Sequence, residues 1–184
     1  MRIITGIYKG RHFDIPRTFK ARPTTDFAKE NVFNVLRQYV DFESATALDL
    51  FSGTGSITLE LLSRGCRQVV SVEKDRDHHR FIQQCVGKLQ GERQQPQGVG
   101  SVQCLRGDVF RYMSTCHQQF DIIFADPPYA LPELPQIPDL IFDHRLLADG
   151  GLFVFEHGKD HAFGTHPHFV DHREYGSVNF SLFQ

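Results

Sequence analysis

Several features that would place a chain in a specialised class are missing from this sequence. No apolar run is long enough to span a membrane, and the charges of Arg2, Lys9 and Arg11 leave no room for an N-terminal signal peptide. The four cysteines form no CxxC pair, which argues against a disulfide framework and against a zinc site. We therefore expect a cytoplasmic protein in a reducing environment, with no membrane partner.

A metal-ligating pattern is also missing, although the chain contains ten histidines. Five of them fall between residues 157 and 172, but no HExxH or comparable ligand spacing occurs there. We expect these side chains to be solvated or locally hydrogen-bonded, and we predict no metal site.

The length and the charge distribution suggest one domain with a basic extension. A chain of 184 residues, 40% hydrophobic and 23% charged, can bury a sizeable core as a single domain, residues 1–184. Residues 1–40 carry eight Lys/Arg and three Asp/Glu, whereas residues 41–184 carry twelve and nineteen. We predict a basic extension, 1–40, that faces a polyanion and an acidic core, 41–184, although chance clustering of a few charges would give the same pattern.

The central motif is an apolar run, residues 45–51, followed by Gly53 and Gly55 and then by a helical pattern that ends near Gly65. A strand, a glycine turn and a helix form the first unit of nucleotide-binding α/β folds, although a glycine pair can also be a simple turn. Thr58 occupies the position of the third glycine in the dinucleotide fingerprint, which argues against NAD or FAD. The spacing Asp49-x-x-x-Gly53-x-Gly55 resembles the glycine motif of S-adenosylmethionine-dependent methyltransferases.

Two further acids follow the next predicted strands. Glu73 ends the apolar run 69–72, at a distance from the glycines that suits a ribose hydroxyl pair; the alternative is an exposed acid at a strand end. Asp108 follows the short strand 102–105, where a carboxylate can accept from an exocyclic amine or can cap a helix.

The remaining pattern alternates strands with helices and predicts an α/β sandwich with one antiparallel edge. It begins with a hairpin over residues 1–15, whose turn combines Tyr8 with Lys9 and Arg11, a mixture suited to phosphates and stacked bases. We expect helices from 24–26 to about 40, over 75–90 and over 141–147, strands over 120–125 and 152–156, and two strands within 169–183.

The chemistry is indicated by Asp126-Pro127-Pro128-Tyr129, directly after the strand 120–125. An exocyclic amine is a poor nucleophile, and a carboxylate and a backbone carbonyl that accept its N–H groups free its lone pair. The prolines stiffen the loop, and Tyr129 offers a face for an unstacked base. A Pro-Pro turn with a solvated Asp126 is the alternative interpretation.

These motifs occur together with Gly6-Ile7-Tyr8-Lys9-Gly10-Arg11, Arg22-Pro23-Thr24-Thr25-Asp26 and Tyr175-Gly176-Ser177. In this order the chain resembles, nearly end to end, the bacterial 16S rRNA guanine-N2 methyltransferases, the small-subunit rRNA methyltransferase D type. The resemblance implies a Rossmann-like class I methyltransferase sandwich, with a mostly parallel seven-stranded sheet, one antiparallel strand, and an N-terminal β-hairpin and helix. It also implies S-adenosyl-L-methionine as cofactor and, as partner, 16S rRNA within the 30S subunit or a late assembly intermediate.

The resemblance also implies roles for particular residues. The target base is expected at Asp126, Pro127, Pro128 and Tyr129. The cofactor is expected at Asp49, Phe51, Ser52, Gly53, Gly55, Glu73, Lys74, Asp108 and Val109. The RNA is expected at Lys9, Arg11, Arg22 and Thr24. Two positions depart from the family pattern: Phe27 replaces a frequent basic residue, and the loop after Tyr129 contains an acid where some relatives have arginines.

Two other functions are compatible with the motifs. An adenine-N6 DNA methyltransferase would use the same loop, but such enzymes usually carry a separate target-recognition domain for which 184 residues leave no room. A methyltransferase-like RNA-binding module without activity would usually have lost the loop at Asp126. Methyl incorporation into ribosomal particles separates these possibilities.

Overall fold

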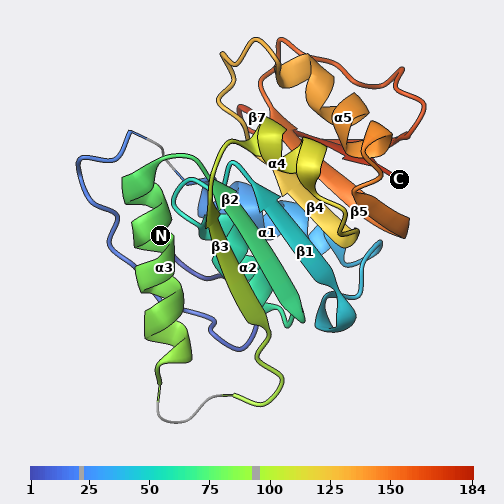
Figure 1. Ribbon diagram of the computed structural model, residues 1–184. Helices are drawn as coiled ribbons and strands as arrows, with labels where there is room; N and C mark the ends of the chain where they lie inside the picture. Colours follow the sequence, from blue (N-terminus) through green and yellow to red (C-terminus); the bar gives the residue numbers. More distant parts are fainter. Residues whose placement is uncertain (21–22, 93–95) are drawn as a thin grey trace.

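The protein is described by a computed structural model over residues 1–20, 23–92 and 96–184. In this part of the chain the strands form a seven-stranded sheet in the order β3-β2-β1-β4-β5-β7-β6 (Figure 1). The strands are β1 (Thr46–Leu50), β2 (Gln68–Glu73), β3 (Ser101–Arg106), β4 (Phe120–Ala125), β5 (Leu147–His157), β6 (Phe169–Tyr175) and β7 (Val178–Phe183). The helices are α1 (Asp26–Leu36), α2 (Ser56–Ser63), α3 (Arg76–Gln90), α4 (Val109–Thr115) and α5 (Ile137–Asp143), with 3-10 turns at Phe42–Ser44 and Leu134–Gln136.

The sheet is parallel from β3 to β5, and β7 runs antiparallel to both of its neighbours. This arrangement confirms the predicted mostly parallel sheet with one antiparallel strand. The predicted antiparallel edge is formed by the last two strands, in which β7 lies between β5 and the edge strand β6 and is antiparallel to both. After β5 the chain first forms β6 at the edge of the sheet. It then reverses at the tight turn that contains Gly176 (φ +66°), and β7 takes the place between β5 and β6.

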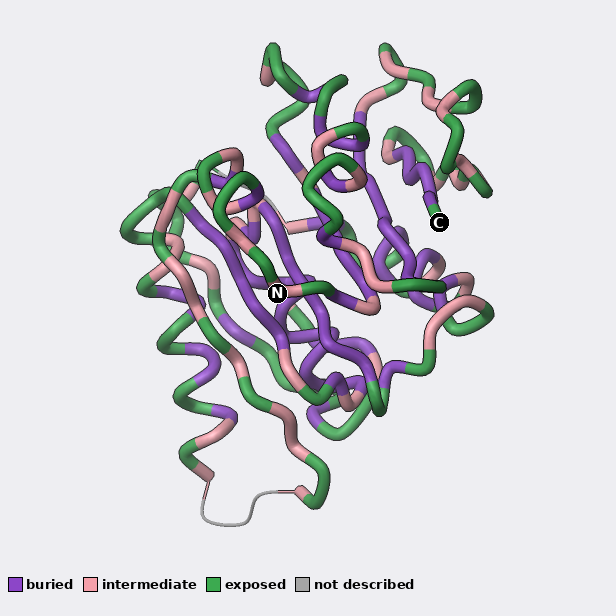
Figure 2. The backbone as a smooth tube through the Cα atoms, turned by 45° about the vertical axis from the view of Figure 1, so that its right-hand side comes forward, coloured by how far each residue is buried: buried purple, intermediate pink, exposed green. Residues whose placement is uncertain are grey.

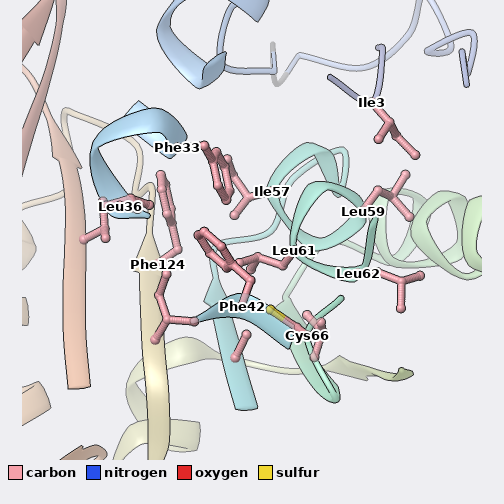
Figure 3. Packing of buried hydrophobic residues seen from close by; sticks show 14 of the residues in the cluster. Ile3, Phe33, Leu36, Phe42, Ile57, Leu59, Leu61, Leu62, Cys66 and Phe124 are labelled. Atoms are coloured by element: carbon pink, nitrogen blue, oxygen red, sulfur yellow. The ribbon is translucent and has the colours of Figure 1, made fainter. Parts of the chain in front are cut away.

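Helices cover both faces of the sheet, so the fold has three layers. Alternate residues of each central strand point to opposite faces: Ala47 and Phe124 join the side chains of α1, α2 and α3, whereas Leu48 and Ile123 join those of α4 and α5. Figure 2 shows the central strands as continuous buried segments. On the first face, Phe33 of α1 stacks on Phe124 with ring centroids 6.4 Å apart (Figure 3). Burial on both faces explains the apolar runs of the sequence.

The N-terminal segment turns back on itself, but the predicted β-hairpin is wrong in its pairing. In the described residues 1–20 one isolated bridge, Arg2 with His12, replaces the two expected strands. The reason is that the backbone N–H groups of Ile4 and Thr5 donate to the Glu60 carboxylate of α2, at 2.8 and 3.1 Å. Gly6 (φ +94°) packs directly against the C-terminal end of α2, since an added Cβ would lie 1.8 Å from the Ser63 carbonyl oxygen.

A buried charge cluster anchors this segment to α2. Glu60 is fully buried and accepts from Nε of Arg64 at 2.9 Å, while Nζ of Lys29 lies 3.8 Å from its other oxygen. Lys29, 1% exposed, also donates to the Arg2 carbonyl at 2.6 Å and to the Ser56 hydroxyl at 2.9 Å. Ser56 is the first residue of α2, directly after the glycine turn, so the N-terminal segment and the predicted cofactor turn share one helix.

Helix boundaries agree with the sequence except in two regions. The predicted end of the first helix near residue 40 is wrong, because α1 ends at Leu36 and is followed by tight turns, in which the Gln38 N–H donates to the Val35 carbonyl and the Tyr39 N–H to the Leu36 carbonyl. Thr25 caps α1 by accepting from the Ala28 N–H at 3.2 Å, as predicted for the Thr-Thr-Asp stretch. The predicted helix over 141–147 is wrong in its limits, since α5 spans Ile137–Asp143. Pro138 lies in the first turn, where a missing N–H costs nothing, and Leu147 begins β5 instead.

Candidate active site

A cleft of about 1020 Å³ lies where the parallel strands end. In this topology ligands bind beyond the carboxyl ends of the parallel strands, and the cleft lies at that edge of the sheet. Its lining residues are Lys20, Pro23, Thr24, Asp49, Phe51, Ser52, Gly53, Thr54, Ser56, Ile57, Glu73, Lys74, Asp75, Arg76, His78, Asp108, Val109, Phe110, Asp126, Pro127, Pro128, Tyr129, Leu131 and Glu156. The cleft brings together the residues predicted for the cofactor and those predicted for the target base, except Gly55.

Gly55 lies behind the glycine turn and not at the cleft surface. It adopts φ +79°, and an added Cβ would lie 2.9 Å from Cγ1 of Ile82 in α3. Gly55 is therefore needed for its backbone conformation and for the close packing of α3. Gly53 (φ +54°) and Ser52 face the cleft, and the Ser52 hydroxyl donates to the Asp49 carbonyl at 2.7 Å.

Glu73 holds the glycine turn from the neighbouring strand. One carboxylate oxygen accepts from the Gly53 N–H at 2.7 Å, and the other accepts from the Asp75 N–H at 2.7 Å. The side chain is 9% exposed, so it is not the solvated strand-end acid that was the alternative interpretation. Each oxygen keeps a free lone pair at the cleft surface, which leaves the predicted contact to a ribose sterically and chemically open.

Asp49 lies at the base of the same turn and is 1% exposed. Burial raises its pKa to about 7, although a hydrogen bond from the Thr58 hydroxyl, 2.5 Å away, favours the charged form. Thr58 is the residue that replaces the third glycine of the dinucleotide fingerprint. Its hydroxyl fixes the orientation of the Asp49 carboxyl group.

Asp108 has the capping role that the sequence left open, and its contact to a ligand stays a prediction. One carboxylate oxygen caps α4 by accepting from the Arg111 N–H at 3.0 Å, and the other lies 3.9 Å from Nζ of Lys74. Asp108 and Val109 both line the cleft. Capping fixes the direction of the carboxylate, and the second oxygen stays exposed toward the space where a ligand would lie.

The loop after β4 places an aromatic face beside a carboxyl group. The Asp126 N–H donates to the Leu50 carbonyl at 3.3 Å, which ties the loop to the end of β1. Tyr129 is 43% exposed, and its ring packs so closely on Gly158 that a Cβ there would lie 3.2 Å from the ring. The hydroxyl of Tyr129 donates to Glu156 at 2.9 Å, so the ring is held with part of its surface open.

Glu156 was not among the residues predicted from the sequence. It is 4% exposed at the end of β5, and it accepts from Tyr129 through one oxygen and from the Thr24 hydroxyl, at 3.0 Å, through the other. Burial, together with the charge of Glu156, raises the pKa of Asp126 well above its ordinary value. Burial raises the pKa of Glu156 in the same direction. An acid at the end of an apolar strand, the signal that identified Glu73, was also present here.

Of the four residues predicted for RNA, the three that the structure describes do not lie on one surface. Thr24 is buried beneath the cleft and bonded to Glu156, and Arg22 lies outside the described residues. Lys9 is exposed, and Arg11 pairs with Glu92 just beyond the C-terminal end of α3. The N-terminal end of α3 lies at the cleft, and its 15 residues put roughly 22 Å between the two ends. Figure 1 shows α3 running along one side of the molecule, with its C-terminal end near the bottom of the view.

Other cations lie at the cleft itself, namely Lys20, Lys74 and Arg76, all exposed. They are outnumbered by the six carboxyl groups that also line it. An acidic lining suits a ligand with fixed positive charge, and S-adenosylmethionine carries a sulfonium and an ammonium group. The donor set therefore fits this cofactor better than it fits a polyphosphate.

Within residues 1–20, 23–92 and 96–184, no three His, Cys, Asp or Glu side chains form a group suited to a metal ion. No helix in the same ranges is long and apolar enough to cross a membrane.

This sheet order and this cleft define a class I methyltransferase fold, and comparisons with known proteins agree. The T. thermophilus 16S rRNA methyltransferase RsmC, solved in complex with AdoMet and guanosine, superimposes with a TM-score of 0.68 at 18% identity, over 90% of this chain and 44% of that one. A Thermus thermophilus hypothetical protein superimposes with a TM-score of 0.79 at 28% identity, over 100% and 99% of the two chains.

The family described as "Conserved hypothetical protein 95" matches residues 1–184. "Ribosomal RNA small subunit methyltransferase D" of Escherichia coli is 30% identical over 187 residues, which cover 100% of this chain and 89% of that protein. The Haemophilus influenzae protein of the same name is 27% identical over 186 residues, 100% and 93% of the two chains. The chain belongs to this family of small-subunit rRNA methyltransferases. The predicted family, fold class and cofactor are thereby confirmed.

Proposed function

We propose that the protein transfers a methyl group from S-adenosylmethionine to the exocyclic N2 amine of a guanine in 16S rRNA of the small ribosomal subunit. Membership of the family supports the methylation of small-subunit rRNA. One observation carries the choice of base. The loop from Asp126 to Tyr129 presents an aromatic face next to a carboxyl group at the cleft that fits the cofactor.

The chemistry of guanine matches this arrangement. The Watson–Crick edge of guanine carries N–H groups on both N1 and N2, so it offers hydrogen-bond donors side by side. Carboxyl oxygens are the acceptors that suit such an edge, and Asp126 and Glu156 concentrate them at one point. The exposed part of the Tyr129 ring offers the stacking surface that an extruded base requires.

The residues of the chain act by positioning. The bound cofactor supplies an activated methyl group on a sulfonium. Asp126 would accept an N–H of the target amine, and Tyr129, held by Glu156, would orient the base. Glu73 and Asp49 would keep the glycine turn in its conformation. Alignment of two reactants in this way can lower a barrier by roughly 7–11 kcal/mol.

RNA would approach the cleft over its rim, where Lys20, Lys74 and Arg76 are exposed. These cations would contact phosphates, which position an RNA without reading its sequence. Lys9 and Arg11 would reach the RNA only if the substrate extends around the molecule, as an assembled 30S particle or a late assembly intermediate does.

The test is methylation of defined substrates by the purified protein with methyl-labelled cofactor. We expect 30S particles from cells that lack this gene to be labelled, and nucleoside-resolved mass spectrometry to identify N2-methylguanosine. The variant Asp126→Ala serves as the matched negative control. Labelled N6-methyladenosine in DNA, or methylation of another atom of the rRNA, would contradict the proposal.

A further inference from the structure

Two aromatic side chains that do not line the cleft meet at the surface of the protein. Phe27, in the first turn of α1, is 65% exposed. Its ring contacts the half-buried ring of Tyr175 edge to face, with centroids 6.2 Å apart. Tyr175 is the last residue of β6 and also contacts the buried ring of Phe180 in β7. Phe27 therefore rests on a neighbour that is anchored in the core, and most of its own surface stays open.

The topology places this Phe27–Tyr175 pair beside the cleft. β6 is antiparallel to β7, which is antiparallel to β5, so β6 ends at the same edge of the sheet as β5. Two strand spacings separate β5 from β6, which is roughly 10 Å. Thr24 lines the cleft and donates to Glu156, and Phe27 follows Thr24 by three residues. Tyr129 donates to the other oxygen of Glu156, so one carboxyl group links the loop of the target base to the segment that carries Phe27.

Few large apolar side chains are exposed in the described part of the chain. They are Ile7, Phe27, Tyr129 and Val170. A single exposed side chain of this kind is common on proteins and requires no ligand. Phe27 and Tyr129, however, are both aromatic and both lie at the carboxyl edge of the parallel strands. Successive aromatic surfaces along one binding edge are typical of proteins that stack several bases of a single strand.

The charges around the Phe27–Tyr175 pair are balanced. Asp26, the residue before Phe27, pairs with Arg2 at 3.0 Å. Arg173 of β6 pairs with Asp171 at 2.6 Å. A cation that is already paired with a carboxylate is a poor ligand for a phosphate, whereas stacking on an aromatic face needs no charge. This surface therefore suits a base better than it suits an RNA backbone.

Extrusion of the target base creates a ligand for such a surface. A base that leaves its stack uncovers the faces of the bases next to it. Those bases belong to the same strand and stay near the cleft that holds the target. We propose that the Phe27–Tyr175 pair stacks on an unpaired base that flanks the target guanine in the RNA substrate. The proposal rests on the proposed function, because it assumes that the substrate is RNA.

The first test measures binding to 30S particles from cells that lack this gene. Phe27→Ala should weaken binding by roughly 5- to 150-fold, the effect of losing one stacked base. The slope of binding against salt should stay unchanged, because stacking releases no counterions. Phe27→Trp, which keeps an aromatic face, should bind like the unmodified protein. Unchanged binding by Phe27→Ala would overturn the proposal.

Two further variants control this measurement. Val170→Ala removes a side chain that is 42% exposed near the opposite end of β6, and it should leave binding unchanged. A loss in Val170→Ala as large as that in Phe27→Ala would overturn the proposal. Circular dichroism checks folding, and we expect α1 to persist because its cap is the Thr25 side chain. If Phe27→Ala does not fold, Phe27→Leu keeps an apolar side chain without an aromatic face and should still lose binding.

The second test identifies the molecule that lies against Phe27. A photoreactive phenylalanine analogue in its place should crosslink to 16S rRNA in 30S particles, at a nucleotide close in sequence to the methylated guanine. Crosslinks to a distant part of the rRNA, to a ribosomal protein or to a second copy of this chain would overturn the proposal. If the unmodified protein methylates no rRNA, the proposed function fails, whereas the crosslink still decides whether the Phe27–Tyr175 pair contacts an RNA base.

Discussion

Replacing Asp126 with alanine removes a carboxyl group from the cleft and leaves the sheet intact. The backbone N–H of residue 126 still donates to Leu50, and β4 keeps its neighbours β1 and β5. The lost side chain is the proposed acceptor for the target amine. Loss of one such positioned contact in a shielded site typically costs about 3–4 kcal/mol, which corresponds to 10²–10³ in rate. We expect Asp126→Asn to be nearly as slow, because its amide can present an N–H to the amine.

Glu73→Ala should weaken cofactor binding more than it slows the methyl transfer, which is the reverse of the effect expected for Asp126→Ala. It removes the acceptor for two backbone N–H groups, those of Gly53 and Asp75, and so frees the glycine turn. Hydrogen bonds to a charged group contribute about 1.5–3 kcal/mol each, and loss of one such contribution weakens cofactor binding by roughly 10- to 100-fold. At saturating cofactor the rate should fall much less than in Asp126→Ala. Glu73→Gln, which keeps one acceptor, should lie between Glu73→Ala and the unmodified protein.

Calorimetric titration of S-adenosylmethionine, run beside single-turnover methylation of 30S particles, measures both effects. Circular dichroism of each variant controls for folding. A collapse of cofactor affinity in Asp126→Ala would show that the two roles are not separable. Full activity in Asp126→Ala would remove this residue from the chemical step.

Three further predictions concern RNA binding and pH. Lys20→Ala with Arg76→Ala, at the cleft rim, should weaken binding to 30S particles and flatten its salt dependence more than Lys9→Ala with Arg11→Ala; equal salt slopes for the two double variants would contradict this. Methylation should be faster on 30S particles than on protein-free 16S rRNA, because one small domain makes a modest interface and needs a structured target; equal single-turnover rates would refute this. A buried acid with a raised pKa stabilises the fold fully below its unfolded pKa, and this stability is lost as the pH rises toward its folded pKa. Asp49→Asn has no such group, so its melting temperature should rise relative to that of the unmodified protein between about pH 4 and about pH 7. A constant difference in melting temperature across that range would show that Asp49 is not protonated in the fold.

The sequence predicted those parts of the fold that local pattern determines. The run before Gly53 had to be a strand and the run after it a helix, and the capping residues Thr25 and Asp75 marked the starts of α1 and α3. The hairpin prediction failed because Ile4 and Thr5 find their hydrogen-bond acceptor in Glu60, more than fifty residues away on a helix. No local pattern contains that information.

The same distinction applies to the candidate site. The cleft residues found from sequence lie at the ends of apolar strands or directly after them, so their meeting at one sheet edge follows from the parallel topology. Glu156 was missed because its role depends on Thr24 and Asp126, which only the folded chain brings to it. Lys9 and Arg11 were grouped with the site because charge counts carry no direction. The anchoring of Ile7 at the Ser63 carbonyl shows that their turn lies at the far end of α2.

The place of β7 in the sheet has a consequence for the folding of the newly synthesised chain. Among the described strands β7 is synthesised last, yet it lies inside the sheet and is the neighbour through which β6 is attached. Until residue 183 has left the ribosome, β5 therefore presents Phe153 and Phe155 on an unpaired edge, which is the kind of surface that chaperones and proteases recognise. A chain cut short by a premature stop or a frameshift near residue 177 would keep an intact Asp126–Tyr129 loop in its sequence but would lack the strand that closes the sheet.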